Sequence, residues 1–203
     1  MIRKIETKEE AENRRKRNIR IMSIILGIIM LLSTAGYAFI SFDNSSSETK
    51  SKLKFGDIEF AKTNAGTWQF SYGGNNYQTI YNPNDVVNVS VKITKTISDY
   101  YNKPLYFGID KREDIANNGE YEIVKNLEKI IIKYQFSCLT KNCYENYPIK
   151  NCSGDNVIVF KQTEANNSII TENQKCVTIS YALGDEERAS DALIFGLLGI
   201  KKA

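Results

Sequence analysis

Residues 21–42 form an uninterrupted run of 22 residues without a charged side chain. A helix of that length rises about 33 Å at about 1.5 Å per residue, which is enough to cross a hydrocarbon core of about 30 Å. Soluble cores rarely contain so long an apolar run, so the sequence predicts a transmembrane helix over residues 19–42. This helix constrains the fold most, because it separates a short segment before it from a long one after it.

Charge is distributed unevenly around this run. The first 20 residues hold eight basic and four acidic side chains, and the basic cluster Arg14–Arg17 lies directly before the apolar residues. The bias of positive charge toward the cytoplasm makes residues 1–18 a basic cytoplasmic tail and places the rest of the chain outside. The net charge of +3 therefore belongs to the tail. It gives no reason to expect nucleic-acid binding.

Two alternatives to an anchor fit parts of this pattern. A cleaved signal peptide would use the small residues Gly36 and Ala38, with cleavage near Ala38 releasing a secreted protein. The apolar run continues beyond Ala38 to Phe42, which is longer than the centre of a signal peptide requires. A filament subunit of the pilin kind is matched less well, because no acid occurs between Ile21 and Asp43. The anchor is the favoured interpretation.

All four cysteines follow the apolar run, at positions Cys138, Cys143, Cys152 and Cys176. An even number of cysteines outside the cytoplasm predicts two disulfide bonds. We expect Cys138 to close a local loop with either Cys143 or Cys152, and Cys176 to take another partner. A four-thiolate zinc site is the alternative, although the spacing lacks the paired C-x-x-C knuckles of such sites.

Asn-x-Ser acceptor sites for N-glycosylation also follow the apolar run. They lie at Asn44, Asn88, Asn151 and Asn166. Asn88 falls inside a predicted strand, and Asn151 directly precedes a cysteine. Asn44 and Asn166 are therefore the better candidates for modification.

The segment after the run predicts a stalk followed by one folded domain. Residues 43–54 have almost no apolar content and indicate a polar, flexible stalk. Residues 55–203 are enough for one hydrophobic core, and we expect an extracytoplasmic α+β domain whose largely antiparallel sheet is covered by two helices. Alternation predicts strands, and helical spacing predicts helices. The predicted elements are a hairpin within 67–81, strands at 86–97, 104–110, 136–139, 156–160 and 176–182, and helices at 120–134 and 185–199.

The sequence offers little catalytic chemistry. It contains no histidine, which excludes Ser-His-Asp and Cys-His catalysis and imidazole metal sites. The polar segment 184–191 is interpreted as a capped first helical turn, and segment 110–120 as a polar loop without the acid spacing of a calcium site. We therefore expect no enzyme, no catalytic residue, no metal site and no cofactor. A pair of carboxylates hydrolysing a glycoside is the rival hypothesis.

The predicted hairpin carries five aromatic side chains: Trp68, Phe70, Tyr72, Tyr77 and Tyr81. Exposed on one face, they would suit a glycan or a protein partner, because aromatic rings dominate such contacts. The commoner fate of such residues is the core of a sheet. We name them as a candidate binding face.

The layout resembles that of small single-span membrane proteins of archaeal type. The similarity rests on the basic tail, the span ending in "STAGYAF" (33–39), the cysteine-containing α+β domain and the terminal "DALIFGLLGI" (191–200). It implies a membrane anchor and no particular activity. The sequence thus predicts a non-enzymatic, membrane-anchored extracytoplasmic domain with a structural or binding role in the cell envelope. Its partner would be an envelope protein or glycan, and its oligomeric state is left open.

Overall fold

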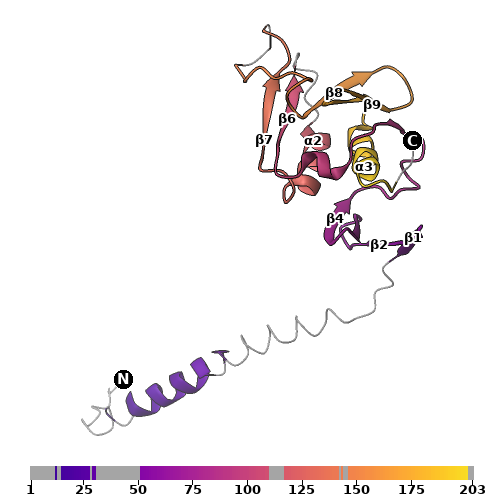
Figure 1. Ribbon diagram of the computed structural model, residues 1–203. Helices are drawn as coiled ribbons and strands as arrows, with labels where there is room; N and C mark the ends of the chain where they lie inside the picture. Colours follow the sequence, from indigo (N-terminus) through magenta and orange to yellow (C-terminus); the bar gives the residue numbers. More distant parts are fainter. Residues whose placement is uncertain are drawn as a thin grey trace. The chain divides into compact units, whose positions relative to one another are not determined.

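The computed structural model describes most of the chain after residue 50 and part of the segment before it. The chain divides into two compact units, Met1–Thr49 and Lys50–Ala203 (Figure 1). The folded core and the candidate site belong to the second unit. The described residues are 12, 15–27, 29–30, 51–109, 117–141, 143 and 146–200.

The first unit is helical at residues 15–27 and 29–30. The described helical residues include part of the basic segment, where Lys16 forms an ion pair of 3.2 Å with Glu12. No helix formed by the described residues is both long and apolar enough to cross a bilayer. This finding contradicts the prediction of a transmembrane helix over residues 19–42. The described helix contains charged side chains, among them Arg15, Lys16 and Arg17, as well as apolar ones.

Other predictions about this part of the chain fall outside the described residues. They concern the end of the predicted span at 31–42, the cleavage site at Ala38 and the acceptor Asn44. The predicted stalk at 43–54 is partly described, and there it is corrected, because Lys52–Phe55 form a strand.

The second unit is an α+β domain with two sheets. The smaller sheet is antiparallel throughout, with its strands in sequence order. Its hairpin turns at Gly73 and Gly74, because Tyr72 pairs with Asn75. Both glycines have positive φ, 57° and 80°, which residues without a Cβ adopt at little cost. The strands are β1 (Lys52–Phe55), β2 (Ile58–Lys62), β3 (Trp68–Tyr72) and β4 (Asn75–Thr79).

The larger sheet has six strands in the order β5-β9-β10-β8-β6-β7. Only β9 and β10 pair antiparallel, and the other four pairings are parallel. The prediction of one largely antiparallel sheet is therefore confirmed for the smaller sheet and wrong for this larger one. Parallel strands lie far apart in sequence and can be buried on both faces, so they show no alternation that would reveal their pairing. The strands are β5 (Ser90–Lys92), β6 (Pro104–Ile109), β7 (Lys133–Cys138), β8 (Val157–Thr163), β9 (Ile169–Asn173) and β10 (Cys176–Ala182).

The predicted strand at 86–97 is reduced to the three residues of β5. Val87, expected on the buried face, is 67% exposed in a turn. Side chains close this turn locally, because the Asn84 amide donates to Asn82 Oδ1 at 2.9 Å and the Asn82 amide donates to Asp85 Oδ2 at 3.1 Å. Such local bonds compete with strand formation.

Two α-helices and one 3-10 helix lie between or beside the sheets in the described part of this unit. They are α2 (Asn117–Leu127), α3 (Glu186–Leu197) and η2 (Ile97–Tyr100). The helix predicted at 120–134 therefore ends early, at Leu127, and the residues from Lys133 onward join the sheet.

Helix α3 packs against both sheets, and Figure 1 shows it between them. The Phe195 ring lies 6.0 Å from Phe60 and 5.8 Å from Phe70 of the smaller sheet. On another side, a Cβ at Gly196 would come within 2.8 Å of Val91 in β5, so only glycine fits there. Contact on several sides explains why eight residues of α3 are buried and why its apolar residues do not form a single stripe.

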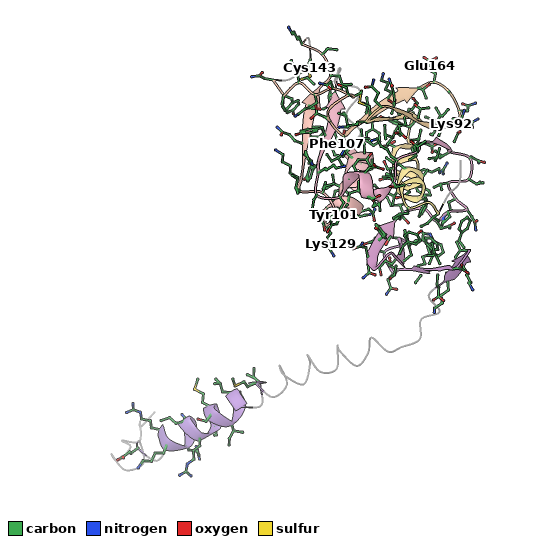
Figure 2. The ribbon with its side chains drawn as sticks, in the orientation of Figure 1. Lys92, Tyr101, Phe107, Lys129, Cys143 and Glu164 are labelled. Carbon is green, nitrogen blue, oxygen red and sulfur yellow. A yellow bond between two sulfur atoms is a disulfide. The ribbon has the colours of Figure 1, made fainter. Side chains whose placement is uncertain are left out.

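The disulfides lie at the larger sheet. Cys138 pairs with Cys143, and Cys152 pairs with Cys176. A small apolar cluster around Tyr106 and Val159 is covered there by Leu139 and Cys152. Figure 2 shows Phe107 inside the domain and Cys143 in the peripheral loop. Because all four sulfurs are paired, the alternative of a four-thiolate zinc site is excluded.

Candidate functional site

The described residues form a groove of about 690 Å³ beside the smaller sheet. Strands β2, β3 and β4 provide one wall, through residues such as Ala61, Gln69 and Gln78. The other wall is the C-terminal end of α2 and the turn after it, from Lys125 to Ile130. Figure 2 labels Lys129 on this second wall.

Strand alternation explains the polar wall. Successive side chains of β3 point to opposite faces, so Trp68 and Phe70 enter the core while Gln69 faces outward. The register places Gln69 opposite Ala61 on one neighbouring strand and opposite Gln78 on the other. The side chain of Ala61 is short, so it leaves space beside Gln69 on the outer face of the sheet. This space forms the hollow of the groove.

Asn126 joins the two walls. Its side-chain Oδ1 accepts the Gln78 backbone N–H at 2.9 Å, and its Nδ2 donates to the Gln78 carbonyl at 2.9 Å. The same Nδ2 donates to the Glu122 carbonyl within α2, also at 2.9 Å. The side-chain amide thus pairs with the edge of β4 as a neighbouring strand would. This contact fixes α2 against the sheet and holds the groove open.

The charged side chains that line the groove largely offset one another. Three are acidic, Asp57, Glu59 and Glu128, and two are basic, Lys125 and Lys129. The hydrogen bond and the positive charge of Lys52, 2.7 Å away, lower the pKa of Glu59. Lys125 in turn contacts both oxygens of Glu122, at 2.7 and 2.8 Å. The groove therefore has no strong field of either sign.

A buried carboxylate lies near the same strand edge. Asp191 of α3 is fully buried, and its Oδ2 accepts the backbone N–H groups of Ile80 at 2.9 Å and Tyr81 at 2.8 Å. Its Oδ1 has no hydrogen-bond partner among the described residues. Burial, together with the charge of Glu122, raises the pKa of Asp191 well above its ordinary value, against the two backbone hydrogen bonds and Lys125.

This carboxylate pair gives no support to a hydrolase. A glycosidase needs two carboxyl groups open to a cleft on either side of the scissile bond. Glu122 and Asp191 are both buried, and neither lines the groove, although Lys125 and Asn126 of the same region do. Both carboxylates belong to the interior of the domain. There Asp191 accepts the backbone N–H groups of Ile80 and Tyr81, which directly follow β4.

The aromatic residues of the hairpin have different environments. Trp68, Phe70 and Tyr77 are 9%, 4% and 4% exposed, and the rings of Phe70 and Tyr77 stack at 5.4 Å between centroids. Tyr72 is 40% exposed, and Tyr81 carries the Arg188 guanidinium 4.9 Å above its ring. Three of the five candidate residues thus belong to the core, with Phe70 and Tyr77 also lining the groove.

The described glycosylation candidates are all exposed. Asn88 lies in the turn before β5 rather than in a strand, and Asn166 lies in the loop between β8 and β9. Asn151 Oδ1 accepts three hydrogen bonds, from Ser153 N, Ser153 Oγ and Gly154 N, at 3.1, 2.7 and 2.9 Å. Modification at these sites stays a prediction.

The two polar segments show no metal chemistry where they are described. In segment 184–191, Asp185 stands at the N-cap position of α3 and forms an ion pair of 3.1 Å with Arg188. Most of segment 110–120 lies outside the described residues, including Asp110, Glu113 and Asp114. Within the described ranges, no three His, Cys, Asp or Glu side chains are grouped so as to hold a metal ion.

The groove itself was not predicted from the sequence. Its walls come from segments far apart in the chain, and the Gln78–Asn126 contact spans 48 positions. The outward residues of the hairpin, Gln69 and Ser71, were visible as the polar half of an alternating pattern. No local signal indicated that α2 would lie beside them, against the edge of β4.

Comparison with known proteins adds no relative. A scan against protein-family models and searches of curated proteins and of solved structures found no match to the chain.

Proposed function

We propose that the chain is a non-enzymatic binding domain that works outside the cytoplasm and takes a component of the cell envelope into the groove between β2–β4 and α2. The observation that carries this proposal is the groove itself. Its volume of about 690 Å³ lies within the range of about 300 to 1,000 Å³ typical of ligand sites. Its walls are joined by the bidentate Asn126–Gln78 contact, so the site is formed before any ligand arrives.

The compartment is supported by the cysteines. Both pairs form disulfides, and such bonds persist in oxidising surroundings such as the cell exterior. The class of function is supported by the groove lining, which offers several side-chain amides and hydroxyls. Three carboxylates also line the groove, but Lys52 lowers the pKa of Glu59, whereas a general acid needs a raised pKa. A role in recognition suits this chemistry better than a role in catalysis.

The test is cosedimentation of the purified full chain with the insoluble envelope fraction of the source cells. Gln69→Trp places a large side chain in the groove at an exposed strand position. Thr171→Trp is the matched control, because Thr171 is exposed on a strand of the other sheet. We expect the first variant to bind at least about 10-fold more weakly, corresponding to about 1.4 kcal/mol, and the control to bind as the unmodified chain does.

Two results would contradict the proposal. One is that the unmodified chain does not sediment with the envelope fraction. The other is that Gln69→Trp and Thr171→Trp bind equally well, which would place the binding surface elsewhere. Thermal unfolding of both variants shows whether each is folded.

A further inference from the structure

We infer that the groove recognises an oligosaccharide of uncharged sugars. This inference rests on the proposed function and names its ligand class. It is carried by three features of the groove: its hydrogen-bonding groups, its apolar base and the closed edge of β4.

The hydrogen-bonding groups match sugar hydroxyls, which both donate and accept. A side-chain amide offers two donors and one acceptor oxygen, so it can bond to a hydroxyl in either role. The side-chain amide of Gln69 has no hydrogen-bond partner among the described residues, and it lines the groove. Asn76 is oriented by the Ser71 hydroxyl, which donates to its Oδ1 at 2.6 Å. Gln78 is oriented through its Nε2, which donates to Thr67 Oγ1 at 2.8 Å.

The apolar base of the groove comes from partly exposed residues of β2 and suits the C–H faces of sugar rings. Ile58 and Ala61 both line the groove and are half-buried. The rings of Phe70 and Tyr77 are 4% exposed and point into the core, so they support the groove from beneath. A ligand that is polar at its rim and apolar on its faces is complementary to such a site, in which a few polar groups orient the ligand over an apolar surface.

The closed edge of β4 argues against a peptide that would bind by strand addition. That mode requires free backbone N–H and C=O groups at a sheet edge. On β4 the Gln78 groups are bonded to Asn126, and directly after the strand the amides of Ile80 and Tyr81 are bonded to Asp191. An added strand would have to displace these side chains.

The charges argue against an anionic polymer. Three carboxylates line the groove against two lysines, and Lys125 already contacts Glu122. Because these charges largely offset one another, the groove has no positive field that would attract a polyanion. An uncharged polar chain needs no such field.

The first experiment identifies the chemical class by treating the envelope fraction before cosedimentation. Periodate cleaves vicinal diols of sugars, whereas a broad protease removes peptide ligands. We expect periodate treatment to abolish binding of the full chain and protease treatment to leave it unchanged. Loss of binding after protease but not after periodate would overturn the oligosaccharide inference while leaving the proposed binding function intact.

The second experiment uses a printed array of neutral oligosaccharides, with titration calorimetry of those that bind. The double variant Gln69→Ala, Asn76→Ala removes two amides that would bond to the ligand, and we expect at least 10-fold weaker binding. Thr171→Ala is the control and should bind as the unmodified chain does. Equal affinity of the double variant and the control, or binding only to charged oligosaccharides, would overturn the inference.

Discussion

The two sheets of this domain place their side chains under different constraints. In β3 of the smaller sheet, Trp68 and Phe70 are buried while Gln69 and Ser71 are exposed. In β8 of the larger sheet, four consecutive residues from Val157 to Phe160 are buried. The smaller sheet therefore has one face free, and that face forms the groove. At its centre the larger sheet has none, because helices cover one side and the disulfide-bonded segment covers the other.

The largest expected effect on stability comes from introducing a lysine into the larger sheet, compared with a lysine introduced into the smaller sheet. Val159→Lys puts an ammonium group into the covered face of β8, where Val159 is 3% exposed. An unpaired buried charge is among the costliest substitutions, and we expect at least about 4 kcal/mol of lost stability or failure to fold. Gln69→Lys on the free face of β3 should change stability by less than about 0.5 kcal/mol. Urea unfolding measures both.

Val159→Ala provides a milder version of the same test, because it retains an apolar side chain. We expect a loss of about 1 to 3 kcal/mol from the cavity that it leaves. A loss no greater than that of Gln69→Ala would show that the covered face of β8 is open in solution, and the contrast between the sheets would fail.

The second prediction concerns the disulfides, both of which lie at the larger sheet. Cys152–Cys176 closes a sequence separation of 24 residues, and Cys138–Cys143 one of five. From the chain entropy of the unfolded state, replacing the first pair with alanine should cost about 3.5 kcal/mol and the second about 2 kcal/mol. Urea unfolding of the two double variants gives the difference. The reverse order would show that native packing, not loop closure, sets the contribution of these bonds.

The third prediction concerns the edge of the smaller sheet. Asn126→Ala removes both partners of the Gln78 backbone, and we expect a loss of about 1 to 2 kcal/mol because water satisfies them only in part. Amide hydrogen exchange should quicken at Gln78. Lys129→Ala, at an exposed position on the same wall, is the control and should leave Gln78 exchange unchanged. Equal protection in both variants would contradict the role assigned to Asn126.

The fourth prediction concerns the pH dependence of stability. The stability difference between Asp191→Asn and the unmodified chain should be smallest in acid. Burial raises the pKa of Asp191, so the folded chain binds this proton more tightly than the unfolded chain. The stability from that proton is complete below the ordinary pKa of 3.8 and is lost as pH rises through the raised folded value. Asp191→Asn has no proton to lose and keeps an oxygen for the amides of Ile80 and Tyr81. We expect equal stability near pH 4 and an advantage for the variant that grows with pH.

Urea unfolding of both proteins from pH 4 to pH 8 checks this difference. Glu122 and Lys125 act on Asp191 through their charges and are present in both proteins, so their own contributions cancel to first order. A constant difference across this range would mean that Asp191 is ionised throughout. The pKa assigned from its burial would then be refuted.

Local sequence signals predicted some elements well. The two glycines between alternating aromatic residues located the β3–β4 hairpin, because only their backbone fits the tight turn without strain. The acids at 185–187 marked the start of α3, where carboxylates favour the positive end of the helix. The same alternation at 86–97 predicted a strand that is mostly a turn, because Asn82 and Asp85 form local bonds instead.

By itself, the sequence determined those features that depend on a few neighbouring residues: the hairpin turn, the start of α3, the uncharged run at 21–42 and cysteines suited to pairing. Only the tertiary structure decided the parallel order of the larger sheet, the closed edge of β4 and the groove. Those features depend on contacts such as Gln78 with Asn126 and Ile80 with Asp191, which are 48 and 111 positions apart. Contacts at such separations become favourable only after the intervening chain has folded, because its loop entropy must first be overcome.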